Sequence, residues 1–207
     1  MKISLSKKTW IVLLSIVGVM AALAVFCTVM ILGVFYRQWD SAPARGVMSA
    51  LHVSVATVGS DPVSYETYLT HLGSVERFLS GPAGQTAGLG AVPTPEMKKS
   101  ILEHAVRIAI IEQLAKERDI IVTPVDLDRS FDALIERAGT STAPGEVKQA
   151  LRDQFGWDEK DFKIFVIQPA MQEELIAQKM ERDTGDKEAF AKEADKRIKS
   201  ATYSMHF

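Results

Sequence analysis

An uncharged apolar run near the N-terminus is the feature that most constrains the fold of this chain. Residues 11–35, IVLLSIVGVMAALAVFCTVMILGVF, contain no Asp, Glu, Lys or Arg. As an α-helix the run would reach about 37 Å, which exceeds the ~30 Å hydrocarbon core of a bilayer. Trp10 and Tyr36 flank the run, where amphipathic aromatic rings favour the membrane interface. The sequence therefore predicts a single transmembrane helix here.

The charges around this run predict its orientation. Lys2, Lys7 and Lys8 precede it, and the first acidic residue is Asp40. Because basic residues tend to stay on the cytoplasmic side, we expect the N-terminus inside and the rest of the chain outside. The predicted location is the cytoplasmic (inner) membrane, single-pass, with a periplasmic ectodomain. The predicted parts are a cytoplasmic tip and transmembrane anchor at 1–36, a tether at 37–51 and a helical ectodomain at 52–207.

Two alternatives to an uncleaved anchor were weighed. The segment Ala42-Pro43-Ala44 has the small-x-small pattern of a signal-peptide cleavage site, but the apolar run is longer than a typical signal h-region. Cys27 could be a lipidation site, yet Phe26 precedes it where a small residue is expected. The sequence therefore favours an anchor that is retained.

Charge and cysteine content exclude several classes of function. The chain has 24 basic and 26 acidic residues and a net charge of -2, which argues against nucleic acid as a partner, since binding phosphates needs a basic excess. Cys27 is the single cysteine, so an intrachain disulfide and a cysteine zinc site are both excluded. A cysteine-free stretch from residue 37 onward suits an oxidising compartment.

The rest of the chain is predicted to be mainly helical, with one strand at each end. Residues 52–58 alternate as a strand does, and an isolated strand leaves its backbone groups unpaired, so we expect it to pair with residues 201–207. The helix over 94–119 is apolar around more than half its circumference and is predicted to form the core. Other helices are expected at 64–79, 123–138, 145–155, 158–182 with a kink at Pro169, and 187–199. Residues 80–95 hold four Gly and three Pro and are expected to be a loop, either flexible or a flap over a binding surface.

Catalytic and metal-binding motifs are not found in the sequence. It contains no P-loop, GxSxG or HExxH pattern, and the histidines are scattered at His52, His71, His104 and His206. We therefore predict no enzymatic activity, no metal and no cofactor.

Aromatic residues gather around a glycine turn late in the chain. Five side chains in or after this turn are the predicted client-binding set: Phe155, Trp157, Phe162, Phe165 and Met171. Aromatic and methionine side chains adapt to varied apolar partners. These residues either fill the core or line an open groove for an extended polypeptide.

One stretch resembles a known family. The segment LAKERDIIVTPVDLDRSFDAL, residues 114–134, resembles the N-terminal domain of SurA-like chaperones, whose relatives include the PrsA and PpiD types of envelope foldase. Asp119 stands where the family usually has glycine, and Gly59-Ser60 where it mostly has Asn-Gly. The resemblance covers about residues 53–182, and DKEAFAKEADKRIKSATYSMHF at the end of the chain looks like the helix and strand that close the family's domain.

The resemblance implies a chaperone without isomerase activity. The family usually carries a parvulin prolyl-isomerase domain, and too few residues follow Arg182 to form one. The predicted fold class is mainly α, with one N-terminal transmembrane helix and a SurA-like ectodomain whose ends are joined by a two-stranded β-ribbon.

The predicted function is a membrane-anchored extracytoplasmic protein that holds unfolded or newly translocated polypeptides. Its predicted partners are unfolded or extended polypeptides, and the membrane through residues 11–35, without nucleic acid. The alternatives are a structural or adaptor subunit of an envelope complex, and a prolyl-isomerase-related protein without its parvulin domain.

Overall fold

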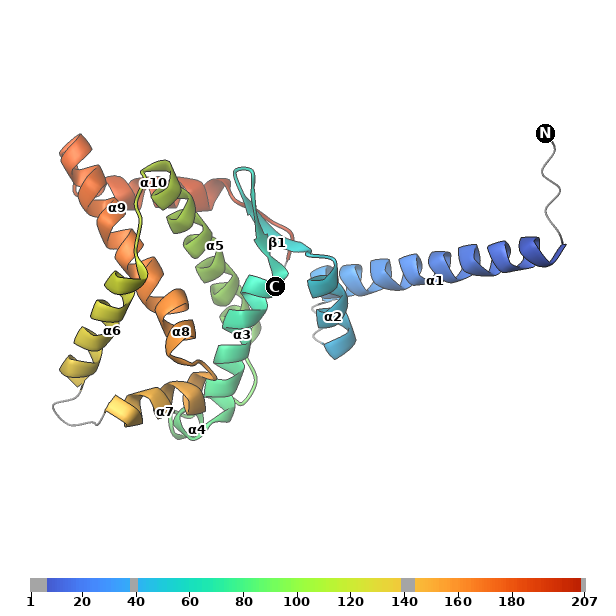
Figure 1. Ribbon diagram of the computed structural model, residues 1–207, viewed down its shortest axis with the longest axis horizontal. Coiled ribbons are helices and arrows are strands. Elements are labelled where there is room, and N and C mark those ends of the chain that lie inside the picture. Colours follow the sequence, from blue (N-terminus) through green and yellow to red (C-terminus); the bar gives the residue numbers. More distant parts are fainter. Residues whose placement is uncertain (1–6, 38–40, 139–143, 206–207) are drawn as a thin grey trace. The chain divides into compact units, whose positions relative to one another are not determined.

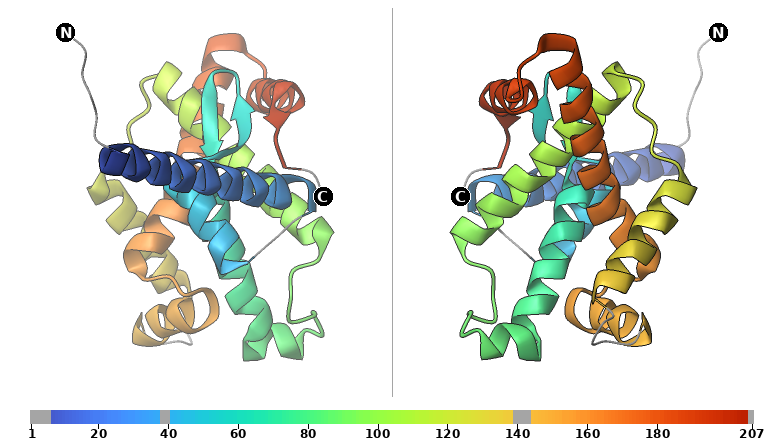
Figure 2. Two further views of the ribbon diagram at one scale, coloured as in Figure 1. Left: turned by 90° about the vertical axis from the view of Figure 1, so that its right-hand side faces the viewer. Right: turned by 90° about the vertical axis from the view of Figure 1, so that its left-hand side faces the viewer.

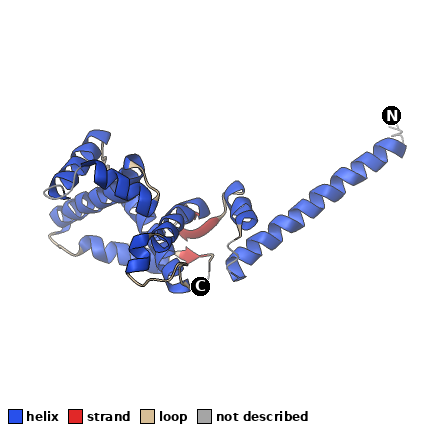
Figure 3. Cartoon of the chain, turned by 90° about the horizontal axis from the view of Figure 1, so that it is seen from below, coloured by secondary structure: helices blue, strands red, loops and turns tan. Residues whose placement is uncertain are grey.

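The computed structural model describes residues 7–37, 41–138 and 144–205, of which residues 7–19 are described by their backbone alone. Helices make up most of the described chain, and three short strands form one sheet (Figure 3). The chain divides into two compact units. One consists of residues 1–53 with 204–206, and the other of residues 54–203.

The first unit contains two helices, α1 (Lys7–Arg37) and α2 (Ala42–Ala50). Within the part of the chain that the structure describes, no helix is both long enough and apolar enough to cross a membrane. The predicted fold class is therefore corrected: the described residues form a mainly helical protein with a small sheet and without the transmembrane helix expected over 11–35.

The sheet of the second unit joins its two ends. Strands β1 (Ser54–Val58), β2 (Asp61–Ser64) and β3 (Thr202–Tyr203) are antiparallel in the order β2-β1-β3. Ala56 lies opposite Tyr203 and Thr57 opposite Thr202, so the predicted pairing of the end segments is confirmed. The predicted two-stranded ribbon is wrong, because β2 adds a third strand. Pro62 lies in β2, where a proline is tolerated because β2 is an edge strand.

Two helices of the second unit begin at a hydroxyl cap. Ser64 Oγ accepts a hydrogen bond from the Thr67 backbone N–H at 3.1 Å, and Thr94 Oγ1 accepts one from Met97 N–H at 3.3 Å. The bounds are α3 (Tyr65–Ser80), α4 (Pro82–Thr86), α5 (Pro95–Glu117), α6 (Pro124–Ala138), α7 (Pro144–Phe155), α8 (Glu159–Phe162), a π-helix η1 (Lys163–Ile167), α9 (Gln168–Thr184) and α10 (Ala189–Ser200).

Helix α4 lies inside the segment that was expected to be a loop. Pro82 stands in its first turn, a position where the missing N–H costs nothing. Gly84 lets the segment return against the end of α3, because a Cβ there would lie 2.5 Å from the Phe78 carbonyl oxygen. Glycine and proline argued against a helix in residues 80–95. In the structure Pro82 begins the short helix α4, and Gly84 allows α4 to pack closely on the end of α3.

Helix α5 is the centre of the second unit, as predicted. It packs against α3, α9, α10 and β1 (Figures 1 and 2). Val106, Ile110 and Leu114 are fully buried along it. Arg197 of α10 binds both carboxylate oxygens of Glu117 at 2.8 and 2.7 Å, which fixes α10 to the end of α5.

Pro169 changes the helix that precedes it. A proline has no N–H, and its ring crowds the carbonyl four residues earlier, which here belongs to Phe165. The chain widens into η1 just before Pro169, where a kink was predicted. Phe162 at the end of α8 and Phe165 within η1 then contact different neighbours.

Candidate functional site

An open pocket of about 330 Å³ lies between α3, α5 and the turn that follows α7. Most of its lining is apolar or aromatic. The lining residues are His71, Ser74, Val75, Phe78, Ser100, Ile101, His104, Phe155 and Trp157. We call this the aromatic pocket.

The wall of the aromatic pocket is a series of rings in contact. Phe78 of α3 and Phe155 of α7 stack with centroids 5.6 Å apart and planes inclined by 5°. Phe155 stacks in turn on Trp157 at 5.6 Å, and Trp157 contacts Phe165 of η1 at 5.9 Å. These separations lie in the range that aromatic pairs prefer. All four side chains are half-buried, so part of each ring is open to solvent.

A glycine between two of these rings sets their positions. Gly156 has φ of +73°, a left-handed conformation that ends α7, and its N–H donates to the Arg152 carbonyl at 3.0 Å. The Arg77 side chain of α3 lies against Gly156, where a Cβ would be 2.6 Å from Arg77 Nε. Arg77 Nη1 also donates to the Arg152 carbonyl at 3.5 Å. Gly156 thus allows α3 to approach the turn that carries Phe155 and Trp157.

Two imidazole rings form the opposite part of the lining. His71 of α3 meets His104 of α5 edge-on at 5.2 Å, and it also contacts Phe165 at 5.8 Å. His71 is 7% exposed, and burial, with a smaller contribution from His104, lowers its pKa to about 4. Burial and then Arg107 also lower the pKa of His104. Both rings are therefore neutral at pH 7, and they add apolar surface to the pocket.

Three of the five predicted client-binding residues lie at the aromatic pocket. Phe155 and Trp157 line the aromatic pocket, and Phe165 contacts Trp157 and His71.

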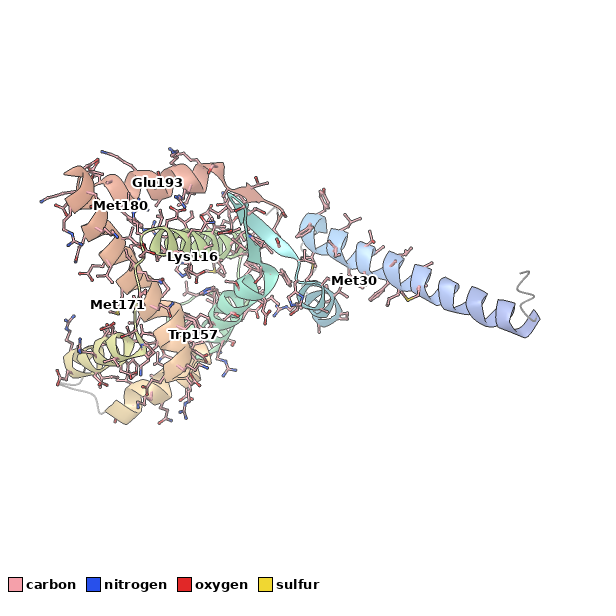
Figure 4. All side chains as sticks on the ribbon, turned by 45° about the horizontal axis from the view of Figure 1, so that its top comes forward. Met30, Lys116, Trp157, Met171, Met180 and Glu193 are labelled. Carbon is pink, nitrogen blue, oxygen red and sulfur yellow. The ribbon has the colours of Figure 1, made fainter. Side chains whose placement is uncertain are left out.

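Phe162 and Met171 pack on a small core formed by Phe131, Leu151 and Ile167, and Phe155 packs on the same core. Phe162 meets Phe131 edge-on at 6.1 Å. Figure 4 labels Trp157, in the turn after α7, and Met171, in α9. Phe155 thus joins the aromatic pocket to the small core, and the role of the five residues in binding a client stays a prediction.

Sequence reasoning missed Phe78, His71 and His104. A signal for His71 was present, because it lies three residues after Tyr68 and one before Leu72, both on the buried stripe of α3. His104 follows the apolar pair Ile101 and Leu102 on α5 but gives no signal by itself. That these side chains lie together depends on how α3 packs against α5.

The aromatic pocket offers binding surface and few polar groups. Ser74 Oγ, in its lining, donates to the Thr70 carbonyl at 3.0 Å within α3. Among the residues that the structure describes, no three His, Cys, Asp or Glu side chains are grouped so that they could hold a metal ion. The arrangement suits an apolar group placed against ring faces.

No family model, no curated protein and no solved structure matches this chain. The resemblance to SurA-like chaperones therefore stays a prediction from the sequence.

Proposed function

We propose that this chain holds unfolded or extended polypeptide segments by taking their apolar side chains into the aromatic pocket. The observation that carries the proposal is the open pocket lined by the stacked, partly exposed rings of Phe78, Phe155 and Trp157. An extracytoplasmic location stays a prediction from the sequence.

The size of the pocket supports loose holding of a client. At about 330 Å³ it is near the lower end of the usual range for ligand sites and suits one or two side chains. Burying one large apolar side chain contributes about 1.5–3 kcal/mol. Binding of this strength is weak and tolerant of sequence, as a holding function requires.

Aggregation of a denatured client tests the proposal. A chemically unfolded protein is diluted into buffer with or without the purified full chain, and light scattering is followed. We expect the chain to suppress scattering at a few-fold excess. The Trp157→Ala variant removes one wall of the aromatic pocket and should suppress it several-fold less.

The matched control is Leu175→Ala, which removes an apolar side chain that is 38% exposed on α9 and does not line the pocket. It should protect the client as well as the unaltered chain does. Far-ultraviolet circular dichroism checks that both variants are folded. If the unaltered chain has no effect on scattering, or if Trp157→Ala and Leu175→Ala behave alike, the proposal fails.

A further inference from the structure

A second cavity lies on the other side of the turn that carries Trp157. It has a volume of about 540 Å³, and its apolar part consists of Pro124, Leu127 and Ile164. Trp157 lines the aromatic pocket, while the next residue, Asp158, lines this charged cavity. The linings of the two hollows alternate along this stretch: Phe155 and Trp157 belong to the aromatic pocket, and Arg152, Asp158 and Lys160 to the charged cavity.

The carboxylates of the charged cavity already have partners. Lys163 Nζ binds Asp128 Oδ1 at 2.7 Å and also binds Glu159. Lys148 Nζ binds the other carboxylate oxygen of Glu159 at 2.7 Å, and these two lysines lower the pKa of Glu159.

The remaining carboxylate, Asp158, caps α8. Its Oδ1 accepts a hydrogen bond from the Asp161 backbone N–H at 2.9 Å. Each acidic side chain of the lining is thus engaged within the protein.

Two cations of the same cavity are not engaged in this way. Arg152 at the end of α7 and Lys160 in α8 both line the cavity and are exposed. Neither side chain has an ion pair or hydrogen bond with any residue that the structure describes. Arg152 and Lys160 can each attract a carboxylate of a bound segment, with Arg152 able to bind it through two N–H groups.

We propose that the client segments held by this chain carry an apolar side chain followed or preceded, a few residues away, by an acidic one. The apolar side chain enters the aromatic pocket, and the carboxylate meets Arg152 and Lys160 in the charged cavity. Because the linings of the two hollows alternate within residues 152–160, the two client side chains are placed a few residues apart. This inference rests on the proposed function and names the substrate class.

Three fluorescein-labelled peptides test the charge preference. Each peptide has a Gly/Ser backbone sequence that contains one Leu-Phe pair. Three residues after that pair, the first peptide carries two Asp residues, the second two Gln and the third two Lys. Dissociation constants are measured by fluorescence anisotropy with the full chain at low and high NaCl. We expect the Asp peptide to bind about three- to tenfold more tightly than the Gln peptide at low salt, and this difference to shrink at high salt.

A double variant assigns the preference to the charged cavity. Arg152→Gln with Lys160→Gln should bind the Asp and Gln peptides equally, with the affinity for the Gln peptide unchanged. The control is Lys187→Gln with Lys199→Gln, which removes the same charge from exposed positions that line neither hollow. It should keep the preference for the Asp peptide.

The outcomes separate this inference from the proposed function. If all three peptides bind the unaltered chain equally, the acidic preference is refuted and the holding function stands. A preference that persists in the Arg152→Gln, Lys160→Gln variant likewise refutes the assignment to this cavity. If none of the peptides binds and denatured clients are not protected, both proposals fail.

Discussion

Acidification should destabilise the folded chain through His71. Its ring is 7% exposed between His104 and Phe165, and its pKa falls from 6.5 to about 4 on folding. Each pKa difference of one corresponds to about 1.4 kcal/mol, so the full effect is about 3 kcal/mol. At pH 5 the same two pKa values give a loss of about 2 kcal/mol relative to pH 8.

The direction of the effect follows from proton binding. Between pH 6.5 and about 4 the unfolded chain binds a proton at His71 and the folded chain does not, so acid favours unfolding. The contribution is fully present above pH 6.5 and is lost progressively as the pH falls to about 4. His104 acts in the same direction, because its pKa is also lowered.

Carboxylates act mostly at lower pH. Glu117 and Glu159 have pKa values lowered by their basic partners, so their stabilising effect is present above the unfolded value of 4.5 and is lost below it. Burial raises the pKa of Glu112, so acidification through its folded pKa acts in the opposite direction. Comparison with a variant that lacks only His71 removes these common contributions.

Urea denaturation between pH 5 and pH 8 measures the effect. The free energy of unfolding of the unaltered chain should fall toward pH 5 by about 2 kcal/mol more than that of His71→Phe, which keeps a ring at this position but cannot take up a proton. His52→Phe, which removes a histidine outside the pocket, should follow the unaltered chain. Parallel pH profiles for the unaltered chain and His71→Phe would show that His71 is not protected from protonation, and the reasoning from its burial would be refuted.

Three further predictions concern a buried side chain of α5, the glycine turn after α7 and an ion pair between α5 and α10. Leu114→Ala removes a fully buried side chain from α5 and should lower the free energy of unfolding by about 3–5 kcal/mol in urea denaturation, with an unchanged m-value. Gly156→Ala places a Cβ at a left-handed φ and 2.6 Å from Arg77 Nε, so it should cost about 1–3 kcal/mol and weaken peptide binding. If Gly156→Ala with Arg77→Ala is no more stable than Gly156→Ala alone, the collision is not the cause. Glu117→Gln should lose about 0.5–1 kcal/mol of stability by removing the ion pair with Arg197, and thermal melts in 1 M NaCl should no longer show the difference.

Much of the second unit could be predicted because local signals agreed with the tertiary structure. The apolar residues of α5 cover most of its surface, and only a helix at the centre of a domain satisfies that pattern. Thr94 and Pro95 marked its start, and both occupy the predicted positions. The pairing of β1 with residues near the C-terminus followed from the need of an isolated strand for a partner.

The errors in the fold arose where one residue type permits two structures. A proline marks turns, but it also suits an edge strand such as β2 and the first turn of a helix such as α4. Gly84 was read as a break, although its small size serves the packing of α4 on α3.

The division of the candidate site has a cause in one residue of the chain. The sequence placed Phe162 and Phe165 in one group because both follow the glycine turn closely, and in a regular α-helix residues three positions apart also share a face. The wider turn of η1, which precedes Pro169, changes this relation. Phe162 packs on Phe131 and Phe165 on Trp157 and His71, so the first supports the small core and the second the aromatic pocket. The aromatic content of the site was thus visible in the sequence, whereas its partition depended on how the backbone accommodates a proline, which periodicity alone does not encode.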